Sequence, residues 1–445
     1  MKKTVSTTGM NAWDQFWFQP ISAVGFGWMR IGYGVIGFLT MALEWSRVSL
    51  FYTGIGVLPH EMLGDVVRST WRFSLLDGAG VAVVWLLYIL LLLSLLLTAL
   101  GLWTRLSLLV SVVLLFSFHE YAMITLDGGD TLMRLIGFIL LLSPCHRAMT
   151  VTNLWKRMEQ VRATGTDQPE QEREMPIWPY RLLMWQMIIL YVASSVEKFT
   201  GSTWRDGSAV AITIHHGNFS RLSAGAADML AWTSPTIGWF VLVTQVVWIF
   251  LLIVPVLQWL RILPSSTQNH LKRALLLSGL LIHGSIFILM DVGTFSLTVM
   301  AAYAGLLIAS DFEALRKVFN RGSKKDPVVV LFDGRCGLCR RSVVALKACD
   351  WLRRLSFANF RDESIRKKYA PNVSLEALDK EIHVTKTKGK FSKGFAGFRV
   401  LTKELPPLWI LVPLLHLPGM EYVGSWVYGY IARNRPRCTD DHCTL

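Results

Sequence analysis

Two cysteines separated by two residues, Cys336 and Cys339, are the groups of this chain best suited to chemistry. They follow Asp333 and Arg335 in a short polar turn, directly after the apolar run 328–332. A strand followed by a turn and a helix places both sulfurs at a helix N-terminus, where unpaired amides and nearby arginines stabilise a thiolate. Cys336, nearer the helix end, is therefore expected to attack a substrate disulfide, and Cys339 to resolve the mixed disulfide.

A zinc site is the main alternative for this pair. A CxxC spacing supplies half of a tetrahedral ligand set, and Cys438, His442 and Cys443 near the C-terminus could supply the rest. An inert pair of thiols is the other alternative. The strand-turn-helix context favours a redox dithiol, and we assign no metal site from the sequence.

Further residues around the dithiol resemble a known family. The motifs are Asp333-Gly-x-Cys336-x-Leu-Cys339, Phe357-x-x-Phe360-Arg-Asp362, Gly394-x-x-Gly397-Phe-Arg and Ala432-Arg-Asn-Arg435. Together they resemble the DCC family of thiol-disulfide oxidoreductases. This resemblance implies a thioredoxin-like fold in which Asp333 and Arg335 support the dithiol.

A second polar group occurs at one end of an apolar run: Tyr191, Glu197, Lys198, Trp204 and Gly207. A lysine at the edge of a membrane bundle is costly to keep charged without a partner, so it can act as a base. The alternative is a lysine that extends to the lipid headgroups, paired with a nearby carboxylate such as Glu197.

The order and spacing of this group also resemble a family. Tyr191, Lys198 seven residues later and then Trp204-x-x-Gly207 are similar to the membrane domain of the vitamin K-dependent gamma-carboxylase superfamily, whose bacterial relatives are called HTTM proteins. The resemblance implies that Lys198 deprotonates a reduced, vitamin K-like quinone. It also implies that Tyr191, Trp204 and Gly207 shape an outward-facing cleft that binds the substrate.

Asp130 and Arg134 are further candidates for substrate binding. They lie four residues apart within another apolar run, so a helix would place them on one face. Charged residues inside a span usually pair or line a cavity. A structural ion pair is therefore the alternative.

The elements that must position these groups are of two kinds. The chain is 52% hydrophobic, its mean hydropathy is +0.41, and apolar runs of roughly 20 residues are long enough to cross a bilayer. The expected spans are 21–43, 80–100, 104–122, 129–145, 179–199, 235–257, 273–290 and 293–311. After residue 327, short strand-like runs alternate with helix-like runs.

We therefore expect a polytopic α-helical membrane bundle of about eight spans, followed by a small α/β thioredoxin-like domain. The bundle would occupy residues 1–311, a basic linker 312–327, and the α/β domain 328–445. The N-terminal segment lacks the short apolar run of a signal peptide, and six unevenly placed cysteines do not form a secreted disulfide framework.

The charge distribution predicts orientation. The net charge is +14, and within residues 1–311 Lys and Arg collect in one set of loops, which indicates both termini in the cytoplasm and a multi-pass protein of the inner (plasma) membrane. Nucleic-acid binding is not expected, because no basic stripe lies within a soluble fold before residue 311. Lys198 would face outward, and the dithiol would meet a cytoplasmic thiol reductant.

The sequence thus predicts an integral membrane oxidoreductase. Its bundle would use Lys198 as a base on a quinone-like or lipidic substrate, and its CxxC dithiol would perform thiol-disulfide exchange. Two other readings are open: a maturation factor for an exported peptide or protein, and a non-enzymatic membrane scaffold with a zinc-bound tail domain.

Overall fold

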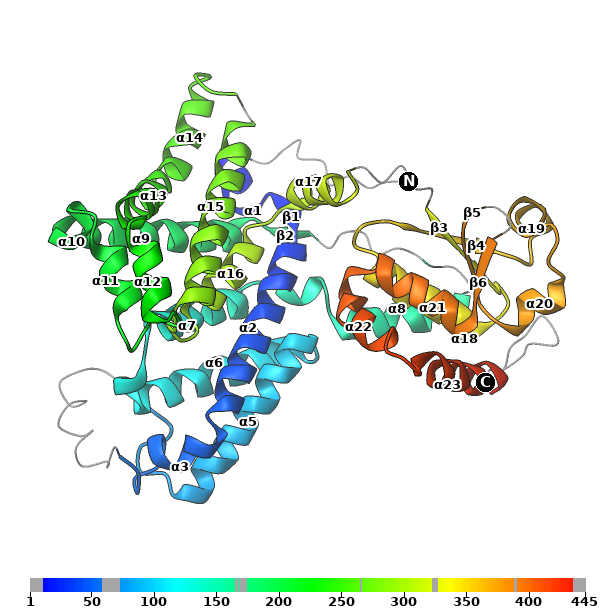
Figure 1. Ribbon diagram of the computed structural model, residues 1–445, viewed down its shortest axis with the longest axis horizontal. Coiled ribbons are helices and arrows are strands. Elements are labelled where there is room, and N and C mark those ends of the chain that lie inside the picture. The colour runs from blue at the N-terminus through cyan, green and yellow to red at the C-terminus, as the bar shows by residue number, and fades with distance from the viewer. Residues whose placement is uncertain are drawn as a thin grey trace. The chain divides into compact units, whose positions relative to one another are not determined.

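The computed structural model describes residues 11–57, 73–164, 167, 174–264, 266–321, 327–387 and 390–434. Its contacts divide the chain into two compact units. Figure 1 shows the helices and strands, coloured from blue at the N-terminus to red at the C-terminus. The first unit contains residues 1–150 and 172–309, and the second contains residues 151–171 and 310–445.

Where the structure describes it, the first unit is helical, apart from one pair of short strands. The longer helices are α2 (Val24–Leu43), α5 (Val81–Leu100), α6 (Thr104–Tyr121), α7 (Gly128–Leu142), α9 (Trp178–Thr200), α13 (Ser234–Val247), α14 (Phe250–Trp259), α15 (Thr267–Leu289) and α16 (Phe295–Gly305). The shorter ones are α1 (Ala12–Phe18), α3 (Val48–Phe51), α10 (Ser202–Arg205), α11 (Ala209–His215) and α12 (Ala224–Ala231). The strands β1 (Pro20–Ser22) and β2 (Glu174–Pro176) pair antiparallel.

Length and hydropathy make this unit a multi-pass membrane bundle. Among the described residues, five helices are long and apolar enough to cross a bilayer, and up to eight spans result if each bent helix pair counts as one. In α5, which has a mean hydropathy of 2.7 over its most apolar window, Leu86 and Leu93 are 66% and 49% exposed. Lipid chains cover such apolar faces, so the expected helical bundle with membrane spans is confirmed.

The expected run 235–257 is not one straight helix. It divides between α13 and α14, where the amides of Trp248 and Ile249 bond to carbonyls three residues earlier. Tighter bonding of this kind marks a local break in an α-helix. The fully buried ring of Trp248 lies at this break.

Arg30 ties two parts of the bundle together. It is fully buried in α2 and donates to the carbonyl of Met149 at 2.6 Å, with a longer bond to Ala148 at 3.4 Å. Intramembrane arginines persist where backbone carbonyls pair with them. Arg30 therefore fixes the turn that follows α7.

The second unit is a small mixed α/β domain, as predicted. Its strands are β3 (Val328–Phe332), β4 (Leu355–Asn359), β5 (His383–Thr387) and β6 (Lys390–Lys393), in the sheet order β4-β3-β5-β6. The β3–β4 pair is parallel, and β3–β5 and β5–β6 are antiparallel. Its helices are α8 (Val151–Thr164), α17 (Ala309–Phe319), α18 (Gly337–Cys349), α19 (Glu363–Tyr369), α20 (Leu375–Lys380), α21 (Gly394–Glu404), α22 (Val412–Leu415) and α23 (Met420–Arg433).

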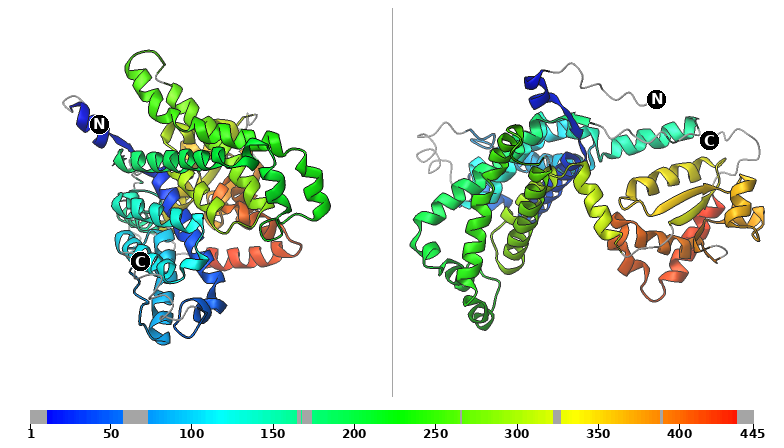
Figure 2. Two further views of the ribbon diagram at one scale, coloured as in Figure 1. Left: turned by 90° about the vertical axis from the view of Figure 1, so that its left-hand side faces the viewer. Right: turned by 90° about the horizontal axis from the view of Figure 1, so that it is seen from above.

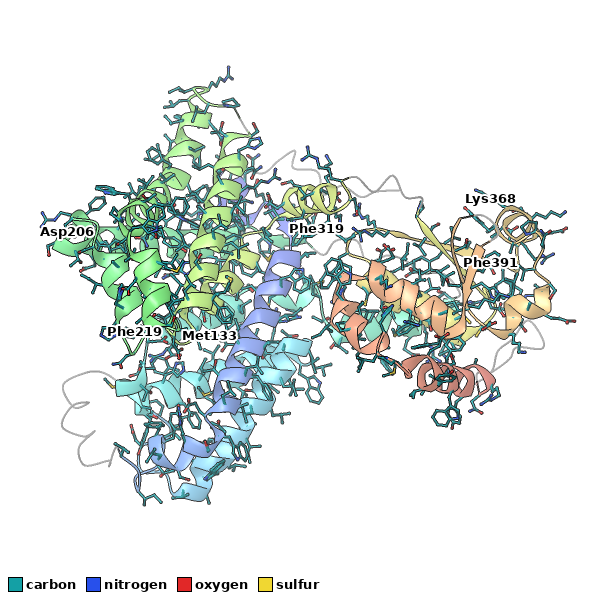
Figure 3. All side chains as sticks on the ribbon, viewed as in Figure 1. Met133, Asp206, Phe219, Phe319, Lys368 and Phe391 are labelled. Atoms are coloured by element: carbon teal, nitrogen blue, oxygen red, sulfur yellow. The ribbon has the colours of Figure 1, made fainter. Side chains whose placement is uncertain are left out.

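Helices cover both faces of the sheet. Alternate residues of β3 point to opposite faces, so Val328 and Val330 join one apolar cluster and Val329 and Leu331 another. The first cluster includes side chains of α18 and α21, and the second includes side chains of α19 and α20. Phe391 on β6 packs against the second cluster, where Figure 3 labels it.

Two helices outside the expected α/β domain belong to this unit. The basic helix α8 packs along α18, and it is the blue-green helix above the yellow sheet region in the right-hand view of Figure 2. The helix α17 covers the first part of the expected linker. Arg316 of α17 donates to the carbonyl of Trp351 at 2.7 Å.

Candidate functional site

The dithiol begins helix α18, where the turn after β3 places it. Cys336 is the N-cap residue, with φ −78° and ψ 117°, and its Sγ accepts a hydrogen bond from the amide of Cys339 at 3.4 Å. This contact is the amide-to-sulfur arrangement that stabilises a thiolate. We call Asp333, Cys336, Cys339 and Arg361 the dithiol site.

The two sulfurs differ in access. Cys336 is 5% exposed, whereas Cys339 is half-buried and lines a cavity of about 320 Å³. The remaining wall is largely apolar and includes Leu338, Phe398 and Tyr428. The sulfur with the hydrogen-bonded amide is thus the less accessible one.

Asp333 is the electrostatic centre of the turn. Its Oδ1 accepts from the amide of Arg335 at 2.8 Å and from Arg361 Nε at 3.0 Å, and its Oδ2 accepts from Arg361 Nη2 at 2.6 Å. Burial raises the pKa of Asp333, but the bonds from Arg361 and Arg335 outweigh it, so this pKa lies below its ordinary value. The side chain of Arg335 is exposed, and its backbone amide supports the turn through the bond to Asp333.

Arg361 connects the dithiol to the rest of the unit. It also pairs with Asp379 at 2.7 Å. Its hydrogen bond to Asp333 is the main cause that raises the pKa of Arg361, and the nearby charge of Cys336 adds to it. In the sequence, Arg361 stands out only as part of the Phe360-Arg-Asp362 motif, which predicts no role for it.

Asn359 closes the turn from the end of β4. Its Oδ1 accepts from the amides of Gly334 at 2.9 Å and Arg361 at 3.1 Å. A Cβ on Gly334 would collide with the Asn359 side chain, so glycine is needed where the two strand ends approach. Arg340 donates to the Gly334 carbonyl from α18.

The zinc alternative depends on residues outside the described part of the chain. Cys438, His442 and Cys443 all lie beyond residue 434. Within the described residues, no group of three or more His, Cys, Asp or Glu side chains is placed to hold a metal ion.

Lys198 lines a larger cavity of about 510 Å³ within the first unit, which we call the Lys198 cavity. Tyr191, Ser194 and Trp204 line it as well. The ammonium of Lys198 donates to Ser194 Oγ at 2.5 Å and lies 5.1 Å from the ring centre of Trp204. The cavity therefore contains a lysine held by one hydroxyl and one aromatic face.

An aromatic network supports one wall of this cavity. The Tyr191 hydroxyl bonds to His283 Nε2 at 2.9 Å and to the Tyr303 hydroxyl. Trp248 stacks against both tyrosine rings, with centroid separations of 4.8 Å to Tyr191 and 6.0 Å to Tyr303. These residues come from α9, α15, α16 and the α13–α14 break, which explains why no single sequence motif contains them.

The other predicted residues of this group lie outside the cavity wall. Glu197 is exposed and is not among the lining residues. Gly207 has φ +83°, and its carbonyl accepts from Ser234 Oγ. Because a Cβ there would press on Pro235, Gly207 allows the turn between α10 and α11 to pack against the start of α13.

Asp130 and Arg134 form a separate polar cluster. Arg134 pairs with Glu120, and its Nε bonds to His119 Nδ1 at 3.3 Å. Asp130 accepts from the amide of Asp127 at 3.1 Å, in a capping box at the start of α7, and lies 3.7 Å from His119 Nε2. Neither residue lines the Lys198 cavity.

Comparison with known proteins identifies one region of the chain. Residues 330–441 match the model of the DCC1-like thiol-disulfide oxidoreductase family. Neither the search of curated proteins nor the search of solved structures returned a match. The chain therefore consists of a helical region with candidate membrane spans and a DCC1-like thiol-disulfide oxidoreductase domain.

Proposed function

We propose that the chain is an integral membrane oxidoreductase whose Cys336–Cys339 pair exchanges disulfides. The main support for this proposal is the amide of Cys339, which donates to Cys336 Sγ at the start of α18. The Cys336 thiolate attacks a substrate disulfide, forms a mixed disulfide and releases one substrate thiolate. Cys339 then displaces the second thiolate, so the substrate gains two electrons and the enzyme becomes a disulfide. A cytoplasmic thiol reductant restores the dithiol.

A trapping experiment tests this step. Cys339→Ser removes the resolving thiol, so the mixed disulfide on Cys336 should accumulate and its partner can be identified by mass spectrometry. Cys349→Ser, which alters a thiol of the same helix outside the pair, is the control and should trap nothing. Recovery of an exported peptide would support the maturation-factor reading. If Cys336 traps nothing and reacts as an ordinary thiol, the exchange function is wrong.

The Lys198 cavity supports a second proposed activity, in which Lys198 removes a proton from a quinone-like or lipidic substrate. The support is the position of Lys198 in an otherwise largely apolar cavity, together with the HTTM-like order of Tyr191, Lys198, Trp204 and Gly207. 1-Naphthol is a suitable probe, since its anion absorbs at longer wavelength than the neutral form. The purified chain should generate the anion band at neutral pH.

Two variants make this test specific. Lys198→Gln should abolish the anion band, because the amide cannot accept the proton. Glu197→Gln should preserve it, because Glu197 is exposed beside the cavity rather than within its wall. An equal band in the wild type and in Lys198→Gln would rule out Lys198 as the base.

We also propose that both termini and the dithiol lie in the cytoplasm. The placement of α8 within the second unit supports one shared side, because the loop after α7 must then lie on the same side of the membrane as the C-terminal domain. The excess of Lys and Arg in that set of loops is the support for naming this side the cytoplasm. The four expected spans between α8 and residue 311 satisfy that condition. Labelling of Arg433→Cys and Arg205→Cys by an impermeant maleimide in intact cells should modify only the cysteine at 205. The reverse pattern would invert the topology.

A further inference from the structure

Two buried side chains of the Lys198 cavity lack hydrogen-bond partners at one atom each. Gln245 on α13 is 7% exposed and His283 on α15 is 3% exposed. Gln245 Oε1 and His283 Nδ1 have no partner in the described part of the chain. Buried polar atoms in folded proteins are nearly always paired, so these two point to a missing ligand.

Both side chains line the same cavity, and most of its remaining wall is apolar. Aliphatic and aromatic residues make up that wall, among them Val210, Ile214, Leu230, Ile237, Phe240 and Ile286. A concave apolar site with a few polar atoms is the usual form of a small-molecule site, in which the polar atoms fix orientation. The ligand is therefore expected to have an apolar body and a small polar head.

The free atoms specify the chemistry of that head. An amide oxygen such as Gln245 Oε1 only accepts hydrogen bonds, so the ligand must supply a donor. The Nε2 atom of His283 is occupied by the Tyr191 hydroxyl at 2.9 Å, which leaves Nδ1 for the ligand. A hydroxyl group can donate its hydrogen to Gln245 Oε1 while its oxygen accepts from His283 Nδ1–H, in the tautomer whose Nε2 accepts from the Tyr191 hydroxyl. A carbonyl or ether oxygen cannot donate to Gln245.

We propose that Gln245 and His283 select a ligand by its hydroxyl group. The Lys198 cavity then binds a phenol- or hydroquinone-like head on an apolar body, and it discriminates against the corresponding carbonyl or ether. This inference deepens the proposed function, because it rests on a quinone-like or lipidic substrate for the Lys198 cavity.

Gln245 and His283 position the ligand through its hydroxyl group. Neither residue is assigned a proton transfer, and Lys198 remains the proposed base. A site built to bond a hydroxyl loses affinity for an analogue without one, because its own polar atoms stay unpaired. The expected discrimination is roughly 10- to 100-fold in affinity.

The test compares two probes of the same body. Binding of 1-naphthol and 1-methoxynaphthalene to the purified full-length chain is measured by equilibrium dialysis at a pH low enough that bound 1-naphthol shows no anion band and keeps the hydrogen that it donates to Gln245. The ratio of their dissociation constants is the readout. Comparing this ratio between variants cancels the unequal partitioning of the probes into detergent. The wild type should prefer 1-naphthol by roughly 10- to 100-fold.

Three variants make the readout specific. Gln245→Met retains a side chain of similar length and should bring the ratio close to one. His283→Phe should reduce the ratio partially, because Gln245 still accepts. Ser285→Ala is the control, since Ser285 lines the same cavity but donates to the Leu281 carbonyl of its own helix at 2.7 Å, and it should leave the ratio unchanged.

The outcomes separate this inference from the proposed base. A ratio near one in the wild type, or an unchanged ratio in Gln245→Met, overturns it, and the second result would mean that water alone satisfies the free atoms. A preference for 1-naphthol at the lower pH, together with no anion band at neutral pH, contradicts the role of Lys198 and leaves the hydroxyl selection intact. An anion band with no preference for 1-naphthol supports Lys198 as the base and contradicts the hydroxyl selection.

Discussion

The dithiol site and the Lys198 cavity are held together by different interactions. The dithiol site gathers its groups from one stretch of 29 residues, 333–361, and charges hold it: Asp333, Arg361 and the neighbouring Asp379 form a connected set of ion pairs. The Lys198 cavity draws on helices about 100 residues apart, and stacked aromatic rings form its support. Its polar atoms are few, and two of them are unpaired.

This contrast indicates that the two sites tolerate different classes of amino-acid substitution. A turn held by buried charges fails when one charge is removed, because the partner is left unpaired at low dielectric. A cavity held by packing fails when volume is added where atoms already touch. Each site should therefore be sensitive to one class of substitution and insensitive to the other.

Arg361→Met should have the largest effect. It leaves Asp333, whose side chain is 9% exposed, without its bidentate partner, and we expect a loss of about 3 kcal/mol in the free energy of opening of the second unit. Hydrogen exchange of the β3 amides measures this loss. The control is Lys367→Met, which removes an exposed pair with Glu363 and should cost less than about 0.5 kcal/mol. Equal losses would contradict the charge-held turn.

Gly279→Ala should damage the cavity and spare the dithiol. A Cβ at residue 279 would collide with the Tyr303 hydroxyl, which bonds to Tyr191, whereas one at Gly284 on the same helix meets no atom within 4 Å. We expect Gly279→Ala to cost about 2 kcal/mol in stability, measured by thermal unfolding, and Gly284→Ala to cost nothing. A matching fall in disulfide-exchange rate in Gly279→Ala would show that the two sites are coupled.

Gly334→Ala tests whether the dithiol site also depends on packing. Its Cβ would displace the Asn359 amide that holds two backbone N–H groups, so we expect a loss of about 1–2 kcal/mol. At Gly337, the first residue of α18, a Cβ meets no atom within 4 Å. Gly337→Ala should therefore gain up to about 1 kcal/mol. Hydrogen exchange of the β3 amides measures the stability of both variants. If Gly334→Ala is as stable as the wild type, the Asn359 side chain does not hold the turn.

The pH dependence should be the smallest effect. The pKa of Asp333 is below its ordinary value in the folded unit, so its contribution to stability is present above the unfolded pKa of about 3.9 and is lost as the pH falls through the folded value. The stability of the second unit should therefore decrease as the pH is lowered below about 5. The stability of the Asp333→Asn variant should decrease less over the same range. Identical pH profiles would exclude Asp333 as the cause.

Much of the dithiol site could be predicted because its signals are contiguous. A buried strand, a polar turn and two cysteines follow one another, and the helix begins at Gly337. The Phe360-Arg-Asp362 motif contained Arg361, but its pairing with Asp333 depends on β3 and β4 lying side by side. The relative exposure of the two sulfurs depends on the surrounding helices, so spacing could not predict it.

The cavity was less predictable. Lys198 and Trp204 were found because they lie six residues apart, but Gln245 and His283 each occur alone in apolar segments. An isolated polar residue in a span gives no indication of its partners. The packing of α8 on α18 was also missed, because α8 reads as an ordinary basic loop helix, and its partner lies 180 residues later.

The membership of α8 in the second unit has a consequence for biosynthesis. The chain passes between the units at residues 150/151, 171/172 and 309/310. Helix α8 therefore leaves the ribosome long before α18, the helix against which it packs, has been translated. Until then its apolar positions, including the buried Val161, have no native cover. Completion of the second unit must therefore wait until nearly the whole chain has been translated. A chaperone is most needed in the interval before that point, while α8 lacks its partner helix.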